Sequence, residues 1–237
     1  MATTDQVHTE PAEFRMHVVT EAIRLFSAKG YESTPVDEIA AAAGVSRRTL
    51  FRQFRSKEDL IFADHETLLE LVAEHLDDPV RSDADPWWAV CEAAELVFAH
   101  YATIRDVAVR RYRVVSQVPA LRDRELVTTY RYQRVFEDFL RRARPAVPRV
   151  RIIAFAAAVT GAHNYLLRSM VRGDDGATAA DLRRELRAIR ASADGFVDDE
   201  RRRDAPQQVA VVTFPSGSTP DEIAEAVRAG LTRHSVP

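Results

Sequence analysis

The chain has 237 residues, of which 46% are hydrophobic and 29% charged, and its formal net charge is −3 at pH 7. This length can bury a sizeable core and suits one small domain plus a larger one. The single Cys91 excludes an internal disulfide, and we expect it in an apolar core rather than as a nucleophile. The polar, mixed opening argues against a signal peptide, and no apolar run approaches the length expected of a membrane span. We therefore expect a cytoplasmic protein without a membrane partner.

Helical periodicity begins near the N-terminus. An amphipathic helix that ends at Lys29-Gly30 is predicted by apolar residues at helical spacing, namely Phe14, Val18, Ile23, Leu25 and Phe26. A short helix then follows, for which Thr34 is a suitable N-cap and Pro35 a suitable first residue. Gly44 stands where a sharp turn needs a left-handed backbone. The apolar face of this short helix consists of Val36, Ile39, Ala40 and Ala43.

A second short helix is expected to begin at Ser46, with Leu50 and Phe54 facing inward. Its other side carries cations with no acid beside them, because no Asp or Glu occurs from Ala40 to Lys57. In a chain of net negative charge, this pattern favours a polyanionic partner such as DNA, whose major groove admits one α-helix. The alternative is a solvated face of a helical hairpin. The cations are Arg47, Arg48, Arg52, Arg55 and Lys57.

The first residues of such a helix can reach base edges, where Arg pairs with guanine and Gln with adenine. We expect the base-reading residues to be Arg47, Arg48, Thr49 and Gln53. The segment Ser56-Lys57-Glu58-Asp59 predicts the start of a further helix that runs through Leu76. Near the N-terminus of that helix, Lys57 is well placed for a DNA phosphate.

Three motifs stand between residues 22 and 58. They are Ala22-Ile23-x-Leu25-Phe26-x-x-x-Gly30-Tyr31, Thr34-x-x-x-x-Ile39-Ala40-x-x-Ala43-Gly44-Val45-Ser46 and Thr49-Leu50-Phe51-x-x-Phe54-x-Ser56-Lys57-Glu58. Together they resemble the N-terminal domain of TetR-family transcriptional regulators. The resemblance implies a homodimer that binds a palindromic double-stranded DNA operator, by default as a repressor released by a ligand.

The resemblance also implies which residues meet DNA phosphates. These are Thr34, Ser46, Phe51, Arg52 and Lys57. Phe51 stands where the family usually has Tyr, so a phosphate-contacting hydroxyl is missing. The pair Arg52-Gln53 also departs from the usual pattern, which leaves the operator sequence unassigned.

Beyond Leu76 the sequence predicts a polar loop and then a series of helices. Their expected ranges are 87–103, 105–117, 119–144, 150–171 and 178–198. In the helix 119–144 we expect four inward residues, namely Tyr130, Val135, Phe136 and Phe139. The helix 150–171 is apolar nearly all round, so it must be buried on more than one side. The resemblance implies that 150–171 and 178–198 form the dimer interface; the alternative is that 150–171 is the core helix of a monomer.

The resemblance implies a ligand pocket among these helices. The candidate lining residues are Trp88, Phe98, Tyr101, Tyr112, Phe136, Phe139, Phe155, His163 and Asn164, although ordinary core packing is the alternative for each. No acidic lining is evident, which argues against a cationic ligand. Three arginines could hold an anionic head group, namely Arg110, Arg111 and Arg113, unless they form a solvated helix face. We therefore expect a large apolar effector such as a fatty acyl-CoA, or else a different small hydrophobic molecule.

The last part of the sequence differs from the rest. Residues 207–214 read as a strand, and Thr219-Pro220-Asp221-Glu222 begins a short helix. We expect this tail to dock and extend the dimer, or to be disordered.

The fold class is therefore expected to be all-α with a strand-helix tail. The expected domains are a helix-turn-helix DNA-binding domain over 10–56, a helical ligand-binding and dimerisation domain over 57–200, and the tail over 201–237. We expect no enzyme, catalytic residue, cofactor or metal, because the chain lacks a glycine-rich loop, a cysteine pair and a spaced histidine cluster. A ligand-independent DNA-binding regulator is the alternative function.

Overall fold

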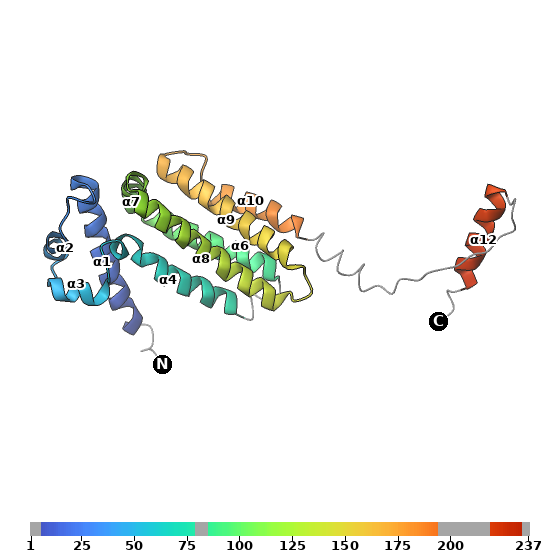
Figure 1. Cartoon of the computed structure of the whole chain (residues 1–237), viewed down its shortest axis with the longest axis horizontal. Coiled ribbons are helices and arrows are strands. Elements are labelled where there is room, and N and C mark those ends of the chain that lie inside the picture. Colours follow the sequence, from blue (N-terminus) through green and yellow to red (C-terminus); the bar gives the residue numbers. More distant parts are fainter. Residues whose placement is uncertain (1–5, 79–84, 194–218, 234–237) are drawn as a thin grey trace. The chain divides into compact units, whose positions relative to one another are not determined.

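The computed structural model describes residues 6–78, 85–193 and 219–233, and within these ranges the chain forms helices and turns without strands (Figure 1). The chain divides into two units, Met1–Val197 and Asp198–Pro237. The all-α class predicted for the body of the protein is therefore confirmed.

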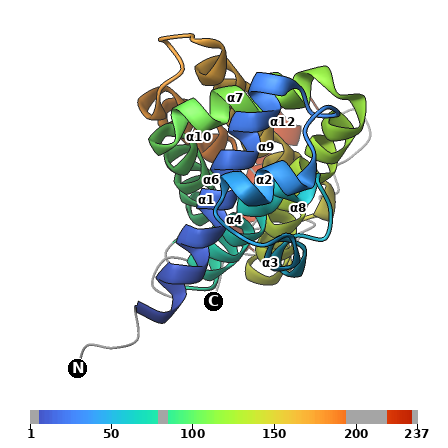
Figure 2. The ribbon, with the colours of Figure 1, turned by 90° about the vertical axis from the view of Figure 1, so that its left-hand side faces the viewer.

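At one end of the first unit, three helices form a small bundle (Figure 2). They are α1 (Gln6–Lys29), α2 (Val36–Ala42) and α3 (Arg47–Gln53). Their shared core contains aromatic and branched residues that the helical periodicity predicts to be buried, namely Ile23, Phe26, Ile39, Leu50 and Phe54. This core continues into the helices behind it, because Phe62, Val114 and Leu121 belong to the same buried cluster.

The turn between α2 and α3 has the geometry that the sequence predicts. Gly44 has a φ of 68°, and the amide of Val45 donates to the carbonyl of Ala40 over 2.9 Å. Ser46 caps α3, since its Oγ accepts from the amide of Thr49 over 3.0 Å. The turn hydrogen bond and the Ser46 cap together fix the direction of α3 relative to α2.

Thr34 does not cap α2 as expected. Pro35 occupies the N-cap position, and the Thr34 hydroxyl instead donates to the carbonyl of Gly30 over 2.8 Å. The hydroxyl therefore donates to the loop before α2 and does not accept from an amide of the helix.

The helix α4 (Asp59–Asp77) begins with reciprocal caps. The Asp59 amide donates to Ser56 Oγ over 3.2 Å, while Asp59 Oδ2 accepts from the Ser56 amide over 3.1 Å. This confirms the start signal at 56–59, although the regular helix begins two residues later than predicted.

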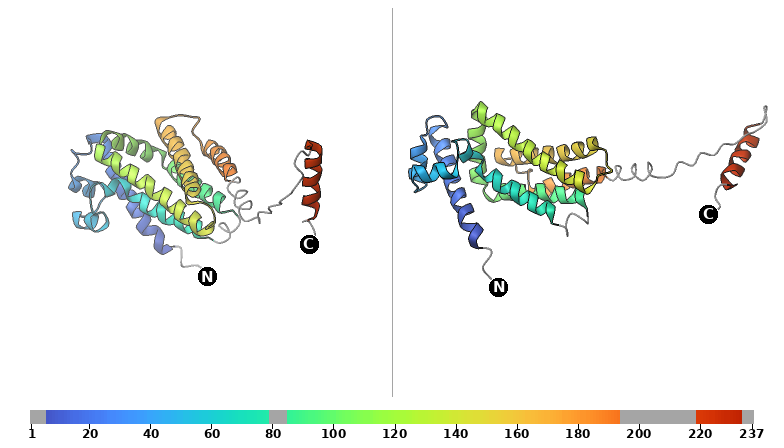
Figure 3. Two further views of the ribbon diagram at one scale, coloured as in Figure 1. Left: turned by 45° about the vertical axis from the view of Figure 1, so that its right-hand side comes forward. Right: turned by 60° about the horizontal axis from the view of Figure 1, so that its bottom comes forward.

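The described part of the first unit contains five further helices, in which α9 packs against both α8 and α10 (Figure 3). They are α6 (Pro86–Thr103), α7 (Arg105–Gln117), α8 (Pro119–Ala143), α9 (Arg149–Arg172) and α10 (Ala179–Ser192). Their large core includes Trp87, Phe98, Phe136, Phe155 and Leu186. Cys91 is fully buried in it, and burial raises the pKa of its thiol to about 12. This confirms the core position predicted for Cys91.

Three expectations about these helices need correction. Tyr130 is 53% exposed rather than inward, because it lies on the outer face of α8. Contrary to expectation, the helix α9 is long and apolar enough by composition to cross a membrane, and 39% of that stretch is buried within the protein. The helix expected over 178–198 ends at Ser192, and residues beyond 193 lie outside the described ranges.

One face of α9 remains exposed in the protomer. It includes Val150 and Tyr165, which are 70% and 71% exposed, and Ile153, which is 37% exposed. Gly161 and small alanines lie between them on the same side. The helix is therefore buried on one face only by the described part of its own chain.

In the second unit, α12 (Pro220–Arg233) forms where the sequence predicts it. The amide of Thr219 donates to Glu222 Oε2 over 2.8 Å, which caps the helix. The predicted strand at 207–214 lies outside the described residues.

The turn at Gly44 provides a test of the small bundle. We expect Gly44→Ala to lower the free energy of unfolding by about 1 kcal/mol, because an L-residue is strained in the left-handed region. Urea denaturation measures this loss. Gly44→Asn is the control, since Asn tolerates that region better and should cost less. An equal loss for both variants would show that strain at this φ is not the cause.

Candidate functional site

The exposed side of α3 carries the predicted DNA-contacting residues. Arg48 and Arg52 are exposed, and Thr49 and Gln53 are half-buried beside them. Phe51 is 42% exposed on the same short helix. Four of the predicted contacts therefore lie with Phe51 on the exposed side of α3.

Arg47 is held by its neighbours in this structure. Its guanidinium donates to both carboxylate oxygens of Asp37 over 3.0 and 2.8 Å and lies 5.3 Å from the centre of the Phe51 ring. All three side chains lie near the surface, so the ion pair is weak and can exchange for a DNA contact. Arg47 is thus close to the expected surface, but it is not free.

Lys57 has a structural role that the sequence did not reveal. Its ammonium donates to the carbonyl of Tyr31 and lies 3.4 Å from the carbonyl of Glu32. It also stands 4.4 Å from the centre of the Tyr31 ring. Because these contacts occupy two of its three N–H donors, Lys57 fixes the loop before α2 and keeps one donor for a phosphate.

Two other predicted phosphate contacts are also occupied. Thr34 is fully buried, with its hydroxyl bound to Gly30, so it does not present that hydroxyl to a phosphate. Ser46 is exposed, but its oxygen serves as the cap of α3.

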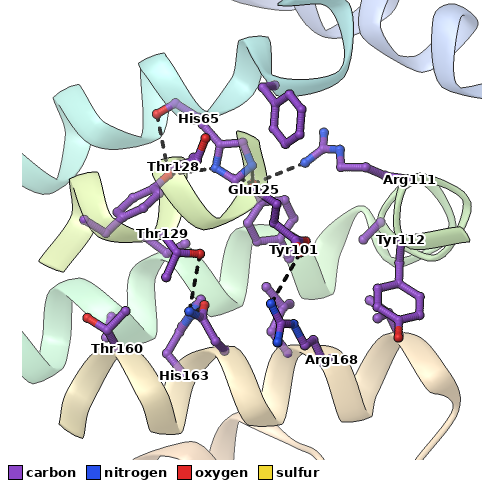
Figure 4. A pocket seen from close by; sticks show the side chains of 18 of the residues that line it. His65, Tyr101, Arg111, Tyr112, Glu125, Thr128, Thr129, Thr160, His163 and Arg168 are labelled. Carbon is purple, nitrogen blue, oxygen red and sulfur yellow. Dashed lines mark hydrogen bonds and ion pairs between the residues drawn. The ribbon is translucent and has the colours of Figure 1, made fainter. Parts of the chain in front are cut away.

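A pocket lies among α4, α6, α7, α8 and α9 (Figure 4). Its cavity volume is about 100 Å³, which is below the ~300–1,000 Å³ of a usual ligand site, so a drug-sized ligand has to displace the pocket walls. Six predicted residues line it, namely Tyr101, Arg111, Tyr112, Phe136, His163 and Asn164. Four others belong to the core and do not line it, namely Trp88, Phe98, Phe139 and Phe155, because they pack between helices on other sides.

The three arginines of the predicted cluster lie on different faces of α7. Arg110 and Arg113 are exposed on the outside of α7, whereas Arg111 is 7% exposed and lines the pocket. Consecutive residues on a helix point about 100° apart, so the three cannot face one ligand. The expected triple contact with an anionic head is therefore wrong.

Arg111 forms a buried ion pair with Asp64 of α4. Its Nη2 lies 2.7 Å from Asp64 Oδ2, and its Nη1 donates to the Tyr101 hydroxyl over 3.2 Å. Burial acts to raise the pKa of Asp64, but the charge and hydrogen bond of Arg111 outweigh it and hold that pKa below its usual value. Both groups are therefore ionised, and α4 is bound to α7 through the interior.

His65, the next residue on α4, extends this network along the pocket wall. Its Nδ1 lies 3.1 Å from the Tyr132 hydroxyl, and its ring nitrogens lie 3.2 Å from the Tyr101 hydroxyl. Burial lowers the pKa of His65 to about 4, so the ring is neutral at pH 7. The polar part of α4 is thus in contact with helices α6 and α8 at the pocket.

The opposite wall is formed by α9 and contains two buried polar atoms. Thr160 Oγ1 and His163 Nε2 are buried and have no hydrogen-bond partner among the described residues. The other ring nitrogen of His163 lies 3.2 Å from Asn164 Oδ1. Burial lowers the pKa of His163 to about 4, so this ring is also neutral.

The pocket does have an acidic lining residue, contrary to expectation. Glu125 of α8 lines it and pairs with Arg168 of α9 over 3.3 Å (Figure 4). The pair spans one side of the pocket. Because the negative charge of Glu125 is paired with the positive charge of Arg168, this side of the pocket has no net charge.

Sequence reasoning missed Asp64 and Thr160. Asp64 follows Leu60 and precedes Leu68 at four-residue spacing, which places an acid on the buried face of α4. A buried carboxylate requires an internal partner, so the position of Asp64 on the apolar face of α4 was a signal in the sequence for a buried ion pair. Among the residues that the structure describes, no group of three His, Cys, Asp or Glu side chains is placed to hold a metal ion.

The family profile described as "Bacterial regulatory proteins, tetR family" matches residues 18–63. The MftR protein of Mycobacterium tuberculosis, named as a mycofactocin biosynthesis transcriptional regulator, is 32% identical over 53% of this chain and 63% of its own. The HTH-type transcriptional regulator AcrR of Shigella flexneri is 47% identical over 22% of this chain and 24% of its own. The chain covers less than two thirds of the length of the first curated relatives that it matches.

The solved structures include the regulator FadR of Bacillus subtilis, which was determined in complex with stearoyl-CoA. It superposes with a TM-score of 0.53 at 16% identity, covering 74% of this chain and 95% of that one. This likeness establishes a shared fold beyond the N-terminal helices. The profile and the curated relatives show that the N-terminal part of this chain is a DNA-binding domain of the TetR family of bacterial regulatory proteins.

Proposed function

We propose that this protein is a dimeric, DNA-binding transcriptional regulator whose DNA affinity is controlled by a largely apolar effector in the pocket. The observation that carries the proposal is the position of α4, which begins beside α3 and forms a wall of the pocket with Phe62 and His65. One helix therefore belongs to both sites. Such a protein would act in the cytoplasm, where bacterial DNA lies.

The proposed DNA-binding surface is the exposed side of α3. Arg48 is exposed beside the N-terminus of α3, where a recognition helix meets base edges. Arg52 lies one turn later and suits a phosphate. Arg47, Thr49 and Gln53 complete the proposed base-reading group, with Arg47 exchanging Asp37 for DNA.

A homodimer through α9 and α10 accounts for the exposed face of α9. A stripe of exposed apolar residues such as Val150, Ile153 and Tyr165 is unfavourable in water unless another surface covers it. The exposed alanines and Gly161 permit close approach of a second helix. Two-fold symmetry would also place two copies of α3 on two half-sites of a palindromic operator. The exposed stripe argues against the alternative of a monomer with α9 as its central helix.

We propose repression that the effector relieves, as is usual in this family. The effector must bind more tightly to the form that does not bind DNA, because equal affinity for both forms would shift nothing. A ligand-independent regulator would need no pocket with buried, unpartnered polar atoms, which is why we favour an effector.

A fatty acyl-CoA is one candidate effector, as in the FadR structure. The apolar lining suits an acyl chain, with Val97, Phe136 and Leu167 among its walls. The phosphates of CoA would have to lie at the exposed Arg110 or Arg113, since Arg111 is committed to Asp64. A hydrophobic molecule without phosphates suits the apolar pocket lining equally well.

The DNA-binding surface can be tested with an operator duplex selected from a random-sequence library. We expect Arg48→Ala to weaken binding to this duplex by about 5- to 150-fold and to affect random DNA much less, because Arg48 reads a base. Arg52→Ala should weaken binding to both DNAs and reduce the salt slope by about one unit, because it removes a phosphate contact. Fluorescence anisotropy over a range of salt measures both effects. An equal loss on both DNAs for Arg48→Ala would contradict its base-reading role.

The dimer can be tested by sedimentation. We expect Tyr165→Asp to weaken self-association by at least about 100-fold, because symmetry buries two new charges in the interface. Its 71% exposure means that the folded protomer should tolerate the change. Leu71→Asp is the control, since Leu71 is 43% exposed on α4, away from the proposed interface. Dimers that persist in Tyr165→Asp would exclude this face.

A further inference from the structure

We propose that the pocket selects a neutral ligand with a hydroxyl group, which donates a hydrogen bond to Nε2 of His163 and accepts one from Thr160. This inference deepens the proposed effector function and rests on it. It names the head group of the effector, whereas the apolar walls define only its body.

The hydrogen bonds around His163 determine which ring nitrogen carries the proton. The Asn164 side chain faces His163 Nδ1 with its oxygen, at 3.2 Å, and faces Thr129 Oγ1 with its nitrogen, at 3.5 Å. An amide oxygen only accepts, so the ring must donate from Nδ1. The ring is neutral, and Nε2 therefore carries a lone pair and requires a donor.

Burial makes this requirement strong. The side chains of His163 and Thr160 point from α9 into the space between α6 and α8 (Figure 4), and these residues are only 8% and 6% exposed. Their free atoms are almost inaccessible to water, and both residues line a largely apolar cavity. A buried polar atom without a partner costs free energy, which a suitable ligand recovers on binding.

The two atoms suit one hydroxyl group. Thr160 and His163 are three residues apart on α9, and side chains at this spacing are neighbours on a helix face. A ligand hydroxyl can donate to Nε2 and accept from the Thr160 hydroxyl at the same time. A ketone or ether can only accept, so it would place a lone pair against that of Nε2.

The charges of the pocket also favour a neutral head. Arg111 is matched by Asp64, and Arg168 is matched by Glu125. Arg111 keeps an unused N–H at Nε, but its charge is already neutralised. A carboxylate or phosphate next to His163 would be buried beside an acceptor without a counter-ion of its own, which is unfavourable.

Isothermal titration calorimetry of the full-length protein at pH 7.5 tests the inference with four ten-carbon probes. They are 1-decanol, 2-decanone, decanoate and decanoyl-CoA. We expect 1-decanol to bind about 10-fold more tightly than 2-decanone, because it alone satisfies both atoms, and decanoate to bind most weakly of the three small probes. Tighter binding of the ketone, decanoate or decanoyl-CoA, or no binding of the alcohol, would overturn it.

Matched variants show whether these side chains cause the preference. Thr160→Val and His163→Leu should each reduce the alcohol-to-ketone ratio by about 3-fold or more, while His163→Gln, which keeps an acceptor, should retain part of it. The control is Thr128→Val, since the Thr128 hydroxyl also lines the pocket but already donates to the Arg124 carbonyl over 2.9 Å. Circular dichroism checks that each variant is folded. A ratio that is unchanged in both Thr160→Val and His163→Leu would overturn the inference.

The effector role is read separately, from the DNA affinity measured with and without saturating 1-decanol. If the alcohol binds as expected and DNA affinity does not change, the proposed effector function fails while the ligand preference stands. If decanoate or decanoyl-CoA binds best and releases DNA, the effector function stands and the hydroxyl preference fails.

Discussion

The buried ion pair between Asp64 and Arg111 is the contact on which the arrangement of this protein depends. It joins α4 to α7 in the interior, with the two residues 6% and 7% exposed. Removing one partner would leave an uncompensated buried charge, which typically costs about 3–5 kcal/mol. The pair stands between the two cores, because Arg111 lines the pocket while Val114 and Val115, one turn later on α7, pack with the DNA-binding bundle.

This position makes α4 the physical link between the two proposed sites. Three more ion pairs hold it to α8, at Asp59–Arg124, Glu66–Arg131 and Asp77–Arg142. Arg131 Nη2 lies 2.8 Å from Glu66 Oε2, and Arg142 Nη2 lies 3.2 Å from Asp77 Oδ1. The surface pairs are individually weak, so a small rearrangement can exchange them, whereas the buried pair resists breaking. A ligand that displaces the pocket walls would therefore move α4 as a unit about Asp64 rather than unfold it.

Local signals in the sequence predicted most of the fold, including the short helix α3 and its exposed side. Caps, turns and helical spacing act over a few residues, and Gly44, Ser46 and Thr178 behave as their chemistry requires. Contacts between distant segments were not predictable in this way. The pairing of Arg47 with Asp37 and the anchoring of Lys57 on the loop carbonyls depend on how helices meet in space. Because contacts between distant segments were not predictable, only some of the aromatic residues predicted to line the pocket do so, and the others pack in the core.

Linkage between the two sites is the central claim, and reciprocal binding tests it most directly. The dissociation constant of 1-decanol is measured by calorimetry on the free protein and on the protein saturated with its selected operator duplex. Thermodynamic reciprocity requires that DNA weaken ligand binding by the same factor by which the ligand weakens DNA binding, typically about 5- to 150-fold. Our account predicts two equal factors in this range. Tight alcohol binding with the same dissociation constant in both states would contradict it.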